Sequence, residues 1–174
     1  MIDKEQAKNL KATAKTWSHI CRGFKLDPNG TKTIRLHGQG HVGEWVYGYY
    51  IPADDSSPLI YGGTEIDDIL GGKKQIEVLK DSICKCTGLA VEKGDSVGKM
   101  LFEYDVVNAG TCIEGIVSKR FFNFENAFVY WHAPTLSWGI MDDRDGKGYP
   151  FNHEWSFEIK GTVFDVDQNF SKND

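Results

Sequence analysis

The sequence lacks any long hydrophobic run: no apolar stretch approaches the ~18 residues that a membrane-spanning helix needs. Basic charge is also scarce, because 20 Lys and Arg stand against 25 Asp and Glu and give a net charge of −5. This balance argues against a nucleic-acid-binding face spread over the whole molecule, although not against a local one. No membrane contact is expected.

Cysteine is also scarce, since the chain has only Cys21, Cys84, Cys86 and Cys112. Four cysteines in a chain of 174 residues favour reduced thiols over a disulfide framework. The first 15 residues are charged throughout and lack the apolar core of a signal peptide. We therefore expect a cytoplasmic location.

The length and composition predict a folded protein rather than a disordered one. Aromatic residues make up 13% of the chain and hydrophobic residues 40%, whereas disordered chains have few aromatics. The 19 glycines fit many tight turns better than long helices. We expect a single compact unit with three regions: an N-terminal helix (1–18), a β-rich N-terminal region (19–80) and a C-terminal barrel region (81–174).

The N-terminal segment carries the clearest helical pattern. Its apolar residues are spaced three and four apart, which places them on one stripe of an amphipathic helix over residues 3–17. The residues of this stripe are Ala7, Leu10, Ala14 and Trp17. Asp3 and Gln6 have the spacing of a capping box at the start of the helix.

Beyond this helix the chain has the texture of strands and turns. Short runs of β-branched and aromatic residues alternate with Gly, Asn, Asp and Pro. The fold class predicted is mainly β, a β-rich α+β protein with additional N-terminal strands. The strands expected are 31–37, 44–51, 59–61, 76–79, 82–86, 102–108, 113–119, 127–132, 136–141 and 157–164.

Two glycine motifs resemble functional loops but lack the necessary context. Gly38–Gly43 matches the dinucleotide pattern GxGxxG, but a strand-like segment comes after it instead of the helix that would hold the pyrophosphate. Gly94–Gly98 matches GxSxG, but charged residues flank it, so Ser96 is interpreted as part of a solvated turn. Both are therefore interpreted as connections between strands, and no cofactor is expected.

Two further clusters are weak candidates for metal sites. Cys84 and Cys86 lie two residues apart, a weak zinc pattern without paired CxxC motifs, and buried thiols on one strand face are the simpler interpretation. The acidic run 142–148 has the wrong glycine spacing for an EF-hand and favours a hairpin with Asp145-Gly146 at its tip. No metal is expected, and no convergent acid, base and nucleophile indicate an enzyme.

Several segments, taken in order, resemble the YopX family of small phage and prophage proteins. They are CRGFKLD at 21–27, GEWVYG at 43–48, CTGL at 86–89, GKMLFEYDVV at 98–107 and FEIKG at 157–161. The resemblance implies an SH3-like small barrel in the C-terminal half, a location in a bacterial host cell, no established catalytic residue and no known cofactor. The chain departs from the family at Tyr104, where the family has glycine, and in two apparent insertions at 32–42 and 135–153.

The residues that carry the family signature are interpreted as structural. Gly88 suits a tight bend, and Asp105 suits a hydrogen bond that closes a turn. The other two signature residues are Thr87 and Leu89.

The aromatic residues supply the only candidates for a binding surface. Trp45, Tyr47 and Tyr49 share one face of an expected strand, and Tyr130 and Trp131 lie on another. Core packing is the favoured interpretation for all five, and a partner surface is the alternative.

The function predicted is that of a non-catalytic protein-binding module or adaptor that contacts a host protein, a phage protein or itself. A homo-oligomer is expected, with helix 3–17 or strand 45–51 at the contact. The alternative is a nucleic-acid-associated small barrel that presents aromatic side chains to single strands. The acidic charge balance makes nucleic acid the less favoured partner.

Overall fold

A computed structural model describes seven stretches of the chain: 20–52, 58–64, 74–91, 96–114, 119–142, 144–151 and 154–165. Antiparallel strands dominate these stretches, so the prediction of a mainly β protein is confirmed. Within them, no helix has the length and apolar character needed to cross a membrane. The predicted helix 3–17 lies outside the described residues.

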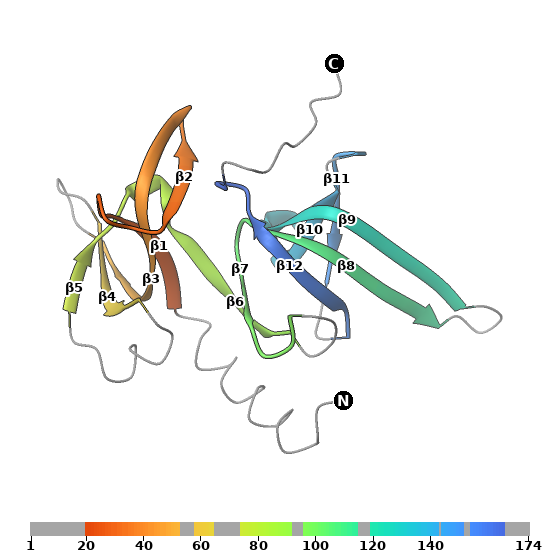
Figure 1. The fold of residues 1–174 in the computed structure, drawn as a ribbon. Helices are drawn as coiled ribbons and strands as arrows, with labels where there is room; N and C mark the ends of the chain where they lie inside the picture. The colour runs from red at the N-terminus through yellow and green to blue at the C-terminus, as the bar shows by residue number, and fades with distance from the viewer. Residues whose placement is uncertain are drawn as a thin grey trace. The chain divides into compact units, whose positions relative to one another are not determined.

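The chain divides into two compact units rather than the single one expected. Unit 1 contains Cys86–Thr162, and unit 2 contains Ile20–Lys85 together with the chain from Val163. The division therefore falls at Lys85, five residues after the boundary expected near residue 80, and the C-terminal segment joins the unit of the first strands. Figure 1 shows the strands of both units.

Unit 2 is built on an antiparallel sheet in the order β5-β4-β3-β1, with β2 paired to β3 and the first residues of β6 paired to β1. The long central strand β3 pairs with three neighbours because it is rich in aromatic and β-branched residues. The strands are β1 (Ile20–Leu26), β2 (Lys32–Leu36), β3 (Gln39–Ile51), β4 (Leu59–Gly63), β5 (Lys74–Glu77) and β6 (Cys84–Ala90).

The glycine motif at 38–43 belongs to the hairpin between β2 and β3. His37 and Gly38 form the two-residue turn with φ of 49° and 79°, the backbone that matches the twist of paired strands. The remaining glycines of the motif lie within β3. A strand and not a helix thus continues from the motif, so the interpretation as a connection between strands is confirmed.

Side chains are buried on both faces of the sheet of unit 2. On one face Phe24 and Trp45 pack edge to face with ring centroids 5.3 Å apart, and Arg22 lies over the Trp45 ring. On the other face Val46 and Ile60 form a small apolar cluster with Val78. Such burial explains why the sequence of β3 is apolar at consecutive positions rather than at alternate ones.

Unit 1 contains an open five-stranded antiparallel sheet in the order β11-β10-β9-β8-β12. The short strands β6 and β7 pair with each other. In Figure 1 the β8–β9 hairpin is the longest element of the sheet. The strands are β7 (Met100–Phe102), β8 (Asp105–Glu114), β9 (Lys119–His132), β10 (Ser137–Asp142), β11 (Lys147–Pro150) and β12 (Ser156–Thr162).

One face of this five-stranded sheet carries the main hydrophobic core. Alternate residues of β8, β9 and β12 point into it, among them Ala109, Phe124 and Phe157, each at most 6% exposed. Phe151 and Trp155 pack on Phe157, with ring centroids 5.1 and 6.3 Å away. The predicted hairpin around Asp145-Gly146 is confirmed as the connection between β10 and β11.

The single strand predicted over 102–108 is wrong. The chain turns at Glu103 and Tyr104, because Asp105 Oδ2 accepts a hydrogen bond from the Phe102 N–H at 2.8 Å and closes the turn. Tyr104 adopts a φ of 65°, a left-handed conformation that glycine favours. The turn thus forms although tyrosine stands where the resemblance implies glycine.

The interpretation of Ser96 as part of a solvated turn is also wrong. The serine is buried at 2% exposure, and its Oγ accepts a hydrogen bond from the Ile159 N–H at 2.7 Å. Ile159 lies beside an irregularity in the β8–β12 pairing, where the register shifts between Ile159 and Gly161. Ser96 therefore supplies an acceptor where the strand ladder is interrupted.

The described strands of unit 1 form an open sheet and not a closed barrel, since β11 and β12 are its two edges. Cys84 and Cys86 are buried thiols on one face of β6, as interpreted from the sequence. In the part of the chain that is described, no three His, Cys, Asp or Glu side chains are grouped to hold a metal ion.

Candidate functional site

The face of the five-stranded sheet opposite the core carries polar side chains at its centre. We call this face of the sheet the outer face. The β8–β12 register pairs Asn108 with Glu158 and Gly110 with Ser156, and the β8–β9 register pairs Gly110 with Asn123. Residues paired across antiparallel strands point to the same side, so three neighbouring strands present these groups together. The outer face comprises Asn108, Gly110 and Cys112 of β8, Phe121, Asn123 and Glu125 of β9, and Ser156 and Glu158 of β12.

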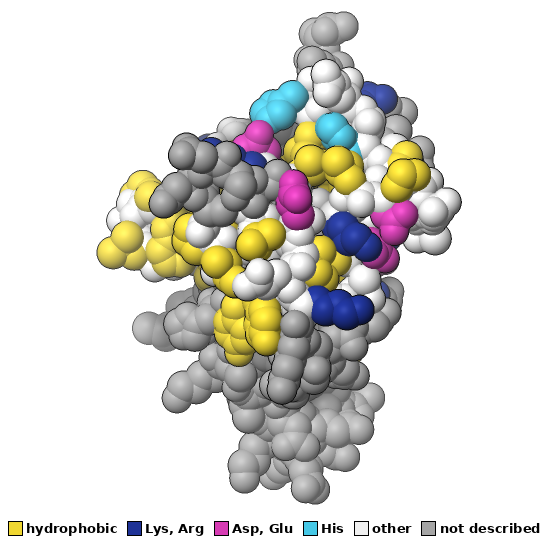
Figure 2. All heavy atoms as spheres, turned by 90° about the vertical axis from the view of Figure 1, so that its left-hand side faces the viewer, with side chains coloured by type: hydrophobic (Ala, Val, Ile, Leu, Met, Phe, Trp, Pro, Cys, Tyr) yellow, Lys and Arg dark blue, Asp and Glu magenta, His cyan; other side chains and the backbone are white. Residues whose placement is uncertain are grey.

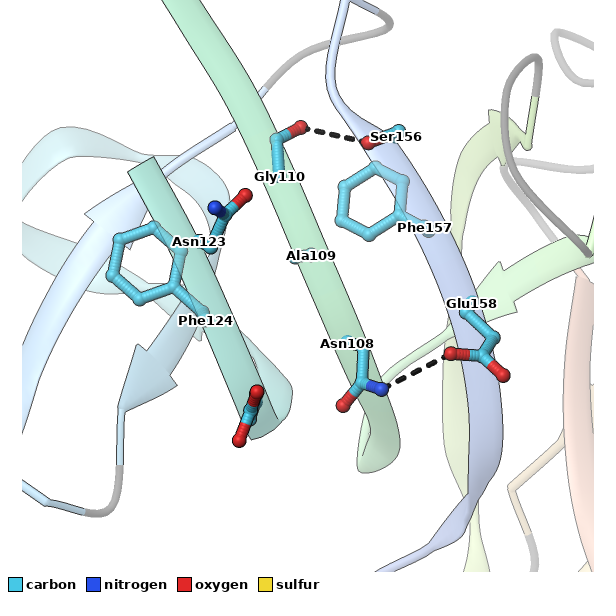
Figure 3. A pocket seen from close by; sticks show the side chains of 9 residues that line it. Asn108, Ala109, Gly110, Asn123, Phe124, Ser156, Phe157 and Glu158 are labelled. Atoms are coloured by element: carbon cyan, nitrogen blue, oxygen red, sulfur yellow. Dashed lines mark hydrogen bonds between the residues drawn. The ribbon is translucent and has the colours of Figure 1, made fainter. Parts of the chain in front are cut away.

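A pocket with a volume of ≈ 360 Å³ opens at this place. Its lining comes from β8, β9 and β12, and Figure 3 shows the labelled side chains arranged on these three strands. The residues that line it are Asn108, Ala109, Gly110, Asn123, Phe124, Glu125, Ser156, Phe157 and Glu158.

Gly110 lies at the centre of the pocket and leaves it open. A β-carbon at this position would lie 3.1 Å from Asn123 Oδ1 and 3.2 Å from Ser156 Oγ. Both distances are shorter than ordinary van der Waals contact, so an alanine here would occupy the space between the two polar groups. The absence of a side chain at Gly110 therefore leaves a hollow between the amide of Asn123 and the hydroxyl of Ser156.

Hydrogen bonds hold several of the lining groups in place. Ser156 Oγ donates to the Gly110 carbonyl at 3.1 Å, and Asn108 Nδ2 donates to Glu158 Oε2 at 3.0 Å (Figure 3). The Asn108 Oδ1 accepts the backbone N–H of Asn126 at 3.1 Å. Asn126 has a φ of 53° and lies where the β8–β9 register shifts, so Asn108 also stabilises a β-bulge.

Charge at the pocket comes mainly from two carboxylates. Lys160 Nζ lies 2.6 Å from Glu158 Oε1, and this hydrogen bond together with that from Asn108 lowers the pKa of Glu158 below its ordinary value. Glu125 is exposed at the other side of the pocket. The carboxylate of Glu158 is therefore ionised at neutral pH.

One exposed aromatic side chain belongs to the same face. Phe121 is 72% exposed and pairs across the hairpin with the exposed Cys112. It precedes Asn123 by two residues, a separation of about 7 Å along a strand. The polar pocket thus has an apolar neighbour on its open side.

The five aromatic candidates from the sequence do not gather into one site. Trp45 is buried in unit 2, whereas Tyr49 is 42% exposed on the same strand and Tyr47 is half-buried. Trp131 is 43% exposed, and Tyr130 is half-buried, which raises the pKa of its phenol. Figure 2 shows hydrophobic side chains reaching the surface in several groups, with charged side chains among them.

The four signature residues have structural contacts. Thr87 Oγ1 donates to the Leu101 carbonyl at 2.9 Å and accepts the Leu89 N–H at 3.1 Å. Gly88 has a φ of 76°, which favours glycine, and Leu89 packs on the core of unit 1. Asp105 closes the turn that precedes β8.

Sequence reasoning missed the pocket residues altogether. Their signal is the alternation of polar or small residues with apolar ones, as in Asn108 and Gly110, which alternate with Val107 and Ala109. This pattern predicts an open polar face on each strand, but it does not show which strands are neighbours.

The chain has no match among protein-family models, among curated proteins or among solved structures. A functional assignment therefore depends on the geometry and chemistry of the outer face.

Proposed function

We propose that the protein is a non-catalytic binding module whose outer face contacts a protein partner. The observation that carries this proposal is the pocket at Gly110, which opens on the face of the sheet opposite the core. Polar side chains from three strands surround it, and the exposed Phe121 lies beside it. Polar groups next to an exposed aromatic ring are typical of surfaces that bind polypeptides.

The lining favours a polypeptide over a nucleic acid. Glu125 and Glu158 place negative charge at the pocket, and phosphate groups would be repelled there. Among the described cations, Lys160 is paired with Glu158, and Arg144 interacts electrostatically with Glu125. Nucleic-acid binding thus has less support than protein binding.

The finer predictions from the sequence belong to the same proposal. They are membership of the YopX family, a helix over 3–17, a cytoplasmic location in a bacterial host, and self-association. The ordered segments from 21–27 to 157–161 support the family, and the exposed aromatic residues of both units support self-association.

A selection of peptides on the full chain tests the proposal. Peptides from a random library would be selected on the immobilised protein, and their dissociation constants measured by fluorescence anisotropy. We expect Gly110→Ala to weaken binding at least tenfold, because the added methyl group fills the hollow. Gly40→Ala is the matched control, since its β-carbon would have only one neighbour, at 4.0 Å.

Thermal unfolding of both variants would verify that they are folded. Asn123→Ala supplies a second test, because it removes an exposed pocket side chain from the middle of β9. Peptides that bind Gly110→Ala as tightly as the wild-type protein would overturn the proposal. So would selective binding of single-stranded oligonucleotides at the outer face.

A further inference from the structure

The hydrogen bonds within the pocket leave it short of donors. The amide of Asn108 donates to Glu158, and the hydroxyl of Ser156 donates to the Gly110 carbonyl. Each hydroxyl has one hydrogen, so Ser156 has only lone pairs left for a ligand. The donors that remain on the pocket side chains of the described chain are the amide of Asn123 and the second N–H of Asn108.

Acceptors, in contrast, are plentiful. The positions of Asn123 Oδ1 and Ser156 Oγ, both near the open side of Gly110, place two neutral acceptors around the hollow. The carboxylate of Glu125 adds two charged acceptor oxygens at the pocket and interacts electrostatically with Arg144. A ligand that complements this lining carries several N–H donors and a positive charge.

The chain itself provides one example of a cation at this rim. Lys160 Nζ lies 2.6 Å from Glu158 Oε1, and both side chains are partly exposed, at 40% and 35%. The ammonium group of Lys160 ends a long and partly exposed side chain, so it can leave Glu158 and move into solvent. A cation from a partner would compete with Lys160 for the carboxylate.

We propose that the pocket takes an arginine side chain of the protein partner, an inference that rests on the proposed function. A guanidinium presents five N–H donors in a planar fork, which suits acceptors that converge from three strands. A lysine ammonium is a compact charge with three donors and suits such a spread of acceptors less well. Phe121 lies close enough along β9 to contact the arginine stem or its plane.

The test is a titration of the isotope-labelled full chain, followed by NMR, with three capped tripeptides. The probes are acetyl-Gly-Arg-Gly-amide, its citrulline analogue, which keeps the shape without the charge, and its aspartate analogue. We expect the arginine peptide to shift the resonances of Gly110 and Asn123. The citrulline peptide should bind at least fivefold more weakly, and the aspartate peptide should cause no shift at these residues.

Three variants sharpen the result. Glu125→Gln should weaken binding of the arginine peptide about fivefold, as expected for the loss of one exposed charge pair at moderate salt. Lys160→Met should strengthen binding of the same peptide about threefold, because the substitution removes the competing cation. Glu77→Gln, an exposed glutamate on β5 of unit 2, is the control and should change nothing.

Equal binding of the arginine and citrulline peptides would overturn the arginine proposal, as would arginine-dependent shifts confined to other surfaces. The two proposals fail differently. If selected peptides lose affinity on Gly110→Ala but contain no arginine, the protein-binding function stands and the arginine pocket is wrong. If peptides bind away from the outer face, the proposed function itself is wrong.

Discussion

The two units use their sheets differently. In unit 2 the central strands are buried on both faces, by Phe24 and Trp45 on one side and by Val46 and Ile60 on the other. In unit 1 the five-stranded sheet buries one face and leaves polar groups and a pocket on the other. The covered part of these strands offers no surface for a ligand, so the open sheet of unit 1 is the better candidate for binding.

The contrast between the units also shows why aromatic content misleads. Trp45 belongs to the most aromatic strand of the chain, and the sequence leaves it open to either core packing, which is favoured, or a binding surface. In the structure it is 7% exposed and packs on Phe24 and Phe164, whereas the isolated Phe121 is 72% exposed. Exposure is decided by the layer that covers a strand, and an aromatic-rich sequence does not reveal that layer.

The largest expected effect contrasts the two faces of the same sheet. Phe157→Ala should lower the free energy of unfolding by about 3–5 kcal/mol, because it empties a site enclosed by Phe151 and Trp155. Phe121→Ala should change it by less than about 0.5 kcal/mol, since its ring is exposed. Urea unfolding of both variants measures the difference, and similar losses would contradict the assignment of core and outer face.

A smaller effect is expected at Ser96. Ser96→Ala should lower the free energy of unfolding by about 1–2 kcal/mol, because the half-buried Ile159 N–H loses its acceptor, the hydroxyl of the buried Ser96, beside the bulge. Val97→Ala is a suitable control, since Val97 is 41% exposed in the same turn. If Ser96→Ala unfolds at the same urea concentration as the wild type, the serine has no structural role.

The contribution of an ion pair at the β10–β11 hairpin to stability should depend on pH. Arg144 donates to both carboxylate oxygens of Asp142 at 3.0 and 2.8 Å, and this hydrogen bonding lowers the pKa of Asp142. Because the pKa of Asp142 is lower in the folded state, the ion pair stabilises the folded protein at pH values above the unfolded-state pKa of about 3.9. That stabilisation is lost as the pH falls through the lowered folded value.

Asp142→Asn should therefore lower the free energy of unfolding by about 1 kcal/mol at neutral pH, a modest figure because Arg144 is largely exposed. The difference from the wild-type protein should shrink as the pH is lowered below about 4. Denaturant unfolding over a pH series measures it. A difference that stays constant down to about pH 2 would show that the ion pair is not the cause.

The smallest expected effect is a gain in stability. Leu136 has a φ of 49° at the end of a short helical turn (Ala133–Thr135), and its side chain is 75% exposed. Leu136→Gly should raise the free energy of unfolding by about 0.5 kcal/mol, because relief of the left-handed strain exceeds the entropy cost of glycine. Leu136→Ala keeps the β-carbon and should bring no gain; equal gains in both variants would point to the exposed side chain instead.

The sequence predicted the class of fold and many strands because local patterns determine them. The His37-Gly38 turn and the Asp145-Gly146 hairpin arise from glycine-containing turn residues, and the aromatic and β-branched composition of β3 marks it as a strand. The break at Glu103 and Tyr104 was not predictable from alternation. It depends on one side-chain hydrogen bond to Asp105, and the residues on either side continue an apolar pattern.

The candidate site was beyond sequence reasoning for a different reason. Gly110, Asn123 and Ser156 come from three strands, and their grouping depends on the order and register of the sheet. Ser96 was misinterpreted for the same reason, since its partner Ile159 is far along the chain. Long-range pairing of this kind leaves no trace in a local pattern.

The most direct test of the central claim is a map of backbone and side-chain amide shifts when a selected peptide is added to the full chain. The account predicts that the largest shifts lie at Gly110, Asn123 and Phe121 of unit 1. Tyr49 and its neighbours on β3 of unit 2 should stay unchanged. Shifts concentrated around Tyr49, with the outer face unaffected, would contradict the account.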